Sequence, residues 1–107
     1  MPSSKSYLEF ITDQLSGLEG VTWRAMMGEY IIYYRGRIVG GIYDDRLLVK
    51  PTASALAMTP GAARELPYEG AKEMLLVDKV EDRAFLEALL TAVAEELPQP
   101  KKRKKTV

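Results

Sequence analysis

The spacing of apolar side chains predicts a helix near each end of the chain. The first covers roughly residues 5–17, opens with a Ser6-Tyr7-Leu8-Glu9 capping box and carries one stripe made of Leu8, Ile11, Leu15 and Leu18. The last begins at Asp82, or alternatively at Asp78 paired with Glu81, because such carboxylates accept hydrogen bonds from the free amides of a helix start. Its broader stripe is suited to covering a sheet and consists of Phe85, Leu86, Leu89, Leu90, Val93 and Leu97.

Short β-favouring runs separated by turn residues fill the middle of the chain. They cover residues 21–27, 29–34, 37–43 and 46–50, and connections this short permit only antiparallel pairing. One or two helical turns within residues 52–59 and another strand over residues 73–77 follow. We therefore expect a two-layer α+β domain, in which an antiparallel meander sheet carries the N- and C-terminal helices on one face. The expected order is helix, three or four strands, short helix, strand, helix.

The second of these strands is apolar on both of its faces. Successive side chains of a strand point to opposite sides, so Ile31 and Tyr33 share one face while Tyr30, Ile32 and Tyr34 share the other. The chain has too little helix to cover both faces. We therefore expect the second face to be partly buried in a partner, most simply a second copy, and we expect a homodimer.

Composition excludes most of the common catalytic chemistries. The 107 residues contain no cysteine and no histidine, which removes thiolate nucleophiles, zinc–thiolate sites and the commonest general base. Fifteen basic residues balance fifteen acidic ones, but five of the basic residues occupy positions 101–105. We expect one folded domain over residues 1–97, a disordered basic tail over residues 98–107, and no enzyme activity, catalytic residue, metal or cofactor.

Five strand residues form a predicted groove for a ligand or partner: Glu29, Tyr30, Gly40, Gly41 and Lys50. Two adjacent glycines inside a strand more often mark a bulge or close helix packing, and the alternative is a groove floor that a ligand approaches. Glu29 opens one strand and Lys50 closes another, so the two could face each other or a pocket. Charged residues at strand ends more commonly lie in water.

The tail is the strongest electrostatic feature of the sequence. Its basic residues could bind a polyanion and give weak, non-specific association with nucleic acid, and they are Lys101, Lys102, Arg103, Lys104 and Lys105. Such ends serve more often as solvated segments. The sequence shows neither a signal peptide nor an apolar run of membrane-spanning length, so we expect a cytoplasmic protein without membrane contact.

Four segments carry a resemblance to a known family. They are Arg24-Ala25-Met26-Met27-Gly28-Glu29-Tyr30, Tyr33-Tyr34-Arg35-Gly36-Arg37, Asp44-Asp45-Arg46-Leu47-Leu48-Val49-Lys50-Pro51-Thr52 and Leu66-Pro67-Tyr68-Glu69-Gly70-Ala71-Lys72. Over roughly residues 5–97 the chain resembles the N-terminal domain of the TfoX/Sxy family. The resemblance implies a helix, an antiparallel meander, a small helix, one or two further strands and a closing helix, similar to type III secretion chaperones. It supplies no catalytic residues.

Full-length TfoX/Sxy proteins regulate natural competence in bacteria and carry a C-terminal helical domain that this sequence lacks. From the residues and the resemblance together we predict a non-enzymatic regulatory or protein-interaction module in a bacterial cytoplasm. Two alternatives stay open. One is a small-ligand-binding domain that uses the predicted groove, and the other is non-specific nucleic-acid association through the tail.

Overall fold

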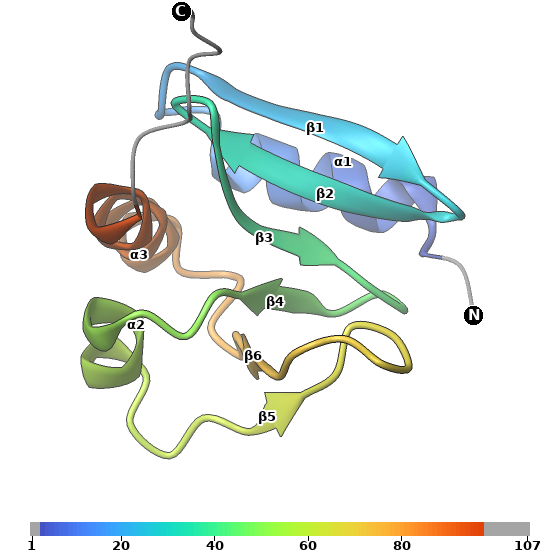
Figure 1. Ribbon diagram of the computed structural model, residues 1–107. Coiled ribbons are helices and arrows are strands. Elements are labelled where there is room, and N and C mark those ends of the chain that lie inside the picture. Colours follow the sequence, from blue (N-terminus) through green and yellow to red (C-terminus); the bar gives the residue numbers. More distant parts are fainter. Residues whose placement is uncertain (1–2, 98–107) are drawn as a thin grey trace, which may run out of the picture.

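Residues 3–97, which the computed structural model describes, form three helices and six strands (Figure 1). In chain order these are α1 (Lys5–Gln14), β1 (Val21–Met26), β2 (Glu29–Tyr34), β3 (Arg37–Ile42), β4 (Leu47–Val49), α2 (Ala53–Met58), β5 (Arg64–Glu65), β6 (Met74–Leu76) and α3 (Arg83–Glu96). The strands form one antiparallel sheet in the order β1-β2-β3-β4-β6-β5, and α1 and α3 pack on it. The expected α+β architecture is confirmed.

The first four strands are joined by three two-residue turns. Both residues of each turn have a positive φ: 53° and 87° at Met27-Gly28, 55° and 77° at Arg35-Gly36, 54° and 55° at Asp44-Asp45. Turns of this hand match the right-handed twist of neighbouring strands, so they favour tight antiparallel hairpins. The turns predicted from the sequence therefore fix the meander.

The sheet continues past β4 through a detour that the sequence did not reveal. After β4 the chain forms α2, returns at the far edge as β5, and then places β6 between β4 and β5. The strand predicted over residues 73–77 is β6, whereas β5 was not predicted because two residues carry no periodicity.

None of the helices in the described range is long and apolar enough to cross a membrane.

The cap of the first helix differs from the prediction. The Ser4 hydroxyl accepts a hydrogen bond from the Tyr7 N–H at 3.1 Å, so Ser4 is the cap and the predicted Ser6 capping box is wrong. The helix also ends at Gln14, earlier than the expected residue 17. At α3 the Asp82 carboxylate accepts from the Phe85 N–H at 3.1 Å, which confirms the first of the two predicted caps.

The hydrophobic core lies between the helices and one face of the sheet. Ile32 and Tyr34 of β2 point into it and are 1% and 3% exposed, whereas Ile31 and Tyr33 lie on the opposite face, as their alternation predicted. Figure 1 shows α1 behind β1 and β2. The predicted stripes supply the helical side of the core with Leu8, Ile11, Leu15, Leu86, Leu89, Leu90 and Val93.

The glycine pair lies beside an irregularity in β3. The register between β2 and β3 shifts at Val39, so one residue is extra on the β3 side, as in a bulge. A Cβ on Gly40 would overlap the Leu48 carbonyl oxygen, and a Cβ on Gly41 would lie 2.6 Å from the Tyr43 ring. The bulge explanation therefore holds, and the close neighbours of both glycines are strand backbone and an aromatic ring rather than a helix.

A loop covers part of the sheet face that carries no helix. Leu48 and Tyr43 are 0% and 6% exposed, although neither belongs to the core cluster. The ring of Tyr68, in the β5–β6 loop, lies with its centroid 6.3 Å from that of Tyr43, and Figure 1 shows this yellow loop beside the β3–β4 turn. Met26 and Ile38 on the same face stay 37% and 39% exposed. The expectation that the chain covers only one face is therefore corrected: its own loop covers part of the second.

Candidate functional site

The helix-free face and the β5–β6 loop together enclose a groove of about 790 Å³. One side is formed by strand residues, the other by residues 67–74, and Leu97, which directly follows α3, also belongs to the lining. The apolar side chains of the lining include Met26, Ile31, Ile38, Pro67, Met74 and Leu97. A volume of this order is typical of sites that bind small molecules or short peptide segments, which hold roughly 300–1,000 Å³.

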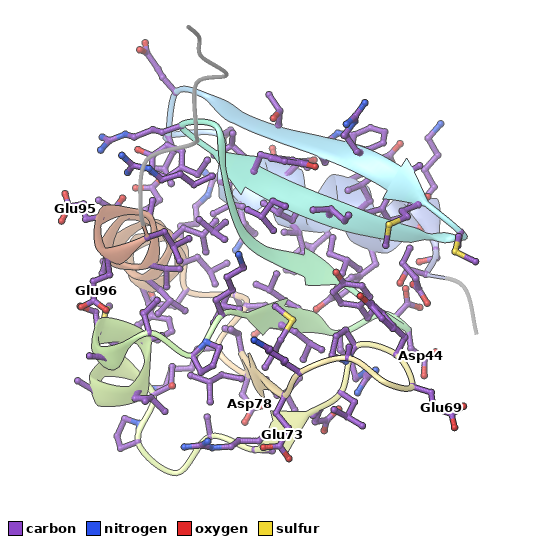
Figure 2. All side chains as sticks on the ribbon, in the orientation of Figure 1. Asp44, Glu69, Glu73, Asp78, Glu95 and Glu96 are labelled. Carbon is purple, nitrogen blue, oxygen red and sulfur yellow. The ribbon has the colours of Figure 1, made fainter. Side chains whose placement is uncertain are left out.

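Two lysines belong to the same lining, and the second of them, Lys72, is exposed. Lys50 follows β4, where alternation places its side chain on the helix-free face, and it is half-buried. Lys72 comes from the opposite, loop side, and neither lysine forms an ion pair within residues 3–97. The carboxylate of Glu73 also belongs to the lining, and Figure 2 shows it on the β5 side. The groove thus combines apolar walls with two lysines and one carboxylate, which leaves a net positive charge in its lining.

Two tyrosine hydroxyl groups add hydrogen-bonding capacity. Tyr43 from the end of β3 and Tyr68 from the loop both line the groove. Burial raises the pKa of the Tyr43 phenol above its usual value, and the neighbouring Tyr68 and Glu29 raise it further. A phenol with a raised pKa keeps its proton at neutral pH, so Tyr43 can donate a hydrogen bond to an anionic group.

Glu29 anchors the N-terminal segment instead of facing the groove. Its Oε1 atom accepts hydrogen bonds from the Ser3 N–H at 3.1 Å, the Ser3 hydroxyl at 2.6 Å and the Asp44 N–H at 3.1 Å. The Ser3 hydroxyl in turn accepts from the Asp45 N–H at 3.0 Å. The interpretation of Glu29 as a solvated strand end is therefore wrong, because this carboxylate joins the chain start to the β3–β4 turn.

The structure brings only part of the predicted groove together. Gly40 and Lys50 line the groove. Tyr30 packs against the core on the other face, and the ring of Tyr43 covers Gly41. No ion pair joins Glu29 to Lys50 in the described part of the chain. The basic residues of the tail, at positions 101–105, lie outside the described residues.

Sequence reasoning missed the loop that forms the second wall. Residues 67–70 contain a proline and a glycine, which are typical of a turn and do not indicate the wall of a groove. Their one unusual feature is Tyr68, an aromatic residue in a segment where turns normally carry small or polar side chains. Lys72 and Met74 gave no local signal, since their place in the groove depends on the pairing of β6 with β4.

The polar groups of the groove are suited to binding. Lysine ammonium groups attract carboxylates or phosphates, and the tyrosine hydroxyls can orient them. Within residues 3–97 no three carboxylates come together as a metal site would require.

The chain is similar to a protein from a bacterium. It is 35% identical over 105 residues to a protein of Spirochaeta aurantia described as an uncharacterized 12.7 kDa protein in the trpE 5′ region. The match spans 97% of this chain and 91% of the relative. No family model matches the chain, and no solved structure matches it. Because the identity extends over nearly the whole of both proteins, the chain belongs to the same family as this 12.7 kDa protein of Spirochaeta aurantia.

Proposed function

We propose that the protein is a non-enzymatic regulatory module that binds an acidic, apolar segment of a partner protein in the groove on its helix-free face. The observation that carries the proposal is the pairing of apolar walls with the unpaired ammonium groups of Lys50 and Lys72. Apolar side chains of the partner would fill the groove, and its carboxylates would reach the two lysines.

Two further observations support a binding role in regulation. The composition has no histidine or cysteine, and this favours binding over catalysis. The resemblance of several segments, such as residues 44–52, to the N-terminal domain of TfoX/Sxy regulators favours a regulatory process in a bacterial cytoplasm. A partner segment is the favoured occupant because strand residues form one side of the groove and the loop residues 67–74 form the other, so an extended segment can lie between them.

A pair of synthetic peptides tests the proposal. One alternates leucine with aspartate over eight positions and the other alternates leucine with lysine, so that apolar content is equal and charge is opposite. Fluorescence anisotropy of the labelled peptides should show binding of the aspartate peptide only. Lys50→Gln should weaken that binding about tenfold, which corresponds to about 1.4 kcal/mol, because one charge-assisted hydrogen bond is lost.

Lys5→Gln is the matched control. Lys5 is an exposed residue of α1, the helix on the opposite side of the sheet, so this variant should bind like the wild type. Equal binding of the two peptides, or an equal effect of the two lysine variants, would contradict the proposed recognition.

A small anionic amphiphile is the second candidate occupant, favoured by the groove volume and by the protonated hydroxyl of Tyr43. Dodecanoate serves as the probe. If it raises the melting temperature in a Lys50-dependent way while the aspartate peptide does not bind, the protein is a small-ligand-binding domain. If neither probe binds, both candidate functions fail.

A further inference from the structure

Strand β1 forms an edge of the sheet and lacks the usual protection of edge strands. It is six residues long, pairs with β2 without a bulge, and five of its residues are exposed. Its one charged residue is Arg24, and it contains no proline. The opposite edge, β5, has two residues and both are charged. Monomeric proteins usually shorten, charge or bulge their edge strands to prevent pairing, so β5 is protected and β1 is not.

The outward backbone groups of β1 belong to Val21, Trp23 and Ala25. The Gly20 carbonyl accepts a hydrogen bond from the Arg35 N–H at 3.4 Å, so it faces β2. In an antiparallel strand the backbone N–H and C=O groups of successive residues point alternately to the two neighbouring sides. The backbone groups of Gly20 and of the even-numbered residues of β1 therefore point toward β2. The N–H and C=O groups of the three odd-numbered residues therefore point away from the sheet, where a further strand would meet them.

We propose that two copies of the chain pair antiparallel through β1, with Trp23 of each copy opposite Trp23 of the other on a two-fold axis. In this register Val21 lies opposite Ala25 of the second copy. Every outward residue then meets an outward residue, which gives about six hydrogen bonds between the copies by the geometry of an antiparallel ladder. The two sheets become one continuous sheet.

The alternative registers leave more of the outward backbone groups of β1 without a partner in the second copy. With the axis at Thr22 or at Arg24, one outward residue of each strand falls opposite a position beyond β1. The axis at Arg24 also places two guanidinium groups opposite each other, which is destabilising. With the axis at Trp23, Thr22 lies opposite Arg24 and no like charges face each other. The strand is thus its own antiparallel complement.

Trp23 is the side chain that would change most on pairing. Its side chain is 43% exposed, although one flank makes an edge contact with Tyr30 at a centroid distance of 5.4 Å. The opposite flank would be covered by the second copy. In this arrangement the helices of both copies lie on one side and both grooves stay open on the other. The inference therefore concerns a different surface from the groove and does not depend on the proposed function.

Sedimentation velocity of the full chain from low to high micromolar concentration tests the proposal. We expect the mass to rise from 12.0 kDa toward twice that value, with micromolar affinity because the interface is small. Trp23 is the chain's single tryptophan, so its emission should shift to the blue over the same concentration range. Ala25→Pro should abolish both changes, because proline removes an outward N–H without touching the β1–β2 ladder.

Ala25→Thr is the matched control and should associate like the wild type, since it keeps the N–H. Circular dichroism checks that Ala25→Pro is folded, and if it is not, Trp23→Lys decides by placing two like charges on the axis. A wild-type chain that stays monomeric at the highest concentration overturns the proposal. So does a dimer that Ala25→Pro, or in its place Trp23→Lys, leaves unchanged, because another surface would then join the copies.

Discussion

Replacing Gly40 by alanine tests how closely β3 and β4 approach in the sheet. A Cβ at this position would overlap the Leu48 carbonyl oxygen and lie 2.9 Å from the Val49 Cα. Carbon atoms in contact are normally about 3.5–4.0 Å apart, so the two strands would have to separate by roughly 1 Å. Both obstacles are backbone atoms, which cannot rotate away as a side chain can.

The expected loss in the free energy of unfolding is about 2–3 kcal/mol. Overpacking typically costs about 1–3 kcal/mol, and the upper end applies here because backbone must move, while the reduced entropy of the unfolded alanine chain returns about 0.4–1 kcal/mol. With a urea m-value of about 1–3 kcal/mol/M, the Gly40→Ala unfolding midpoint should fall by roughly 0.7–3 M.

Gly70→Ala is the control for this measurement. Gly70 has a φ of +88° but no atom within 4 Å of an added Cβ, so alanine there meets backbone strain and no steric clash. We expect that strain to cost about 1 kcal/mol. If Gly40→Ala unfolds at the wild-type midpoint, or loses no more stability than Gly70→Ala, the argument from close strand approach is refuted.

Two polar contacts give further predictions. Glu29→Ala should lower the free energy of unfolding by about 1–3 kcal/mol, because the donors on Ser3 and Asp44 lose their acceptor, and an unchanged urea midpoint would contradict this. The Ser54 hydroxyl and N–H donate to the Glu96 carboxylate and lower its pKa, so Ser54→Ala should raise that pKa in an NMR titration. Since the folded-state pKa is the lower one, this contact stabilises the fold above the unfolded-state pKa and is lost as pH falls through the folded value. An unchanged Glu96 pKa in Ser54→Ala would contradict the assignment of the lowered pKa to this hydrogen bond.

The strands and turns could be predicted from the sequence because their signals are local. Alternation along residues 29–34 and the Arg35-Gly36 pair each depend on neighbours a few residues away, and β2 has the expected bounds. The first helix cap could not be predicted in the same way. Ser4 is favoured over Ser6 by a tertiary contact, since its N–H donates to the Asp45 carboxylate at 2.8 Å.

The candidate site was less predictable because it is formed by residues that lie far apart in the sequence. Lys50 and Gly40 were identified from the strands that carry them, but the facing wall depends on a loop whose position is set by the pairing of β4 with β6. Glu29 looked like a solvated strand end because its partner Ser3 is 26 residues away in the chain. Nothing in the local pattern identifies such a partner.

The separation of groove and core has a consequence for how this family can diverge. The helix-facing side chains of the sheet are packed against α1 and α3, whereas the groove is lined by the opposite side chains and by the β5–β6 loop. Mutations at the exposed positions of this lining, such as Met26, Ile38 and Tyr68, leave the side chains packed between the sheet and the helices unchanged. Relatives that share this scaffold are therefore free to acquire different binding preferences through substitutions there, without a compensating change in the helices.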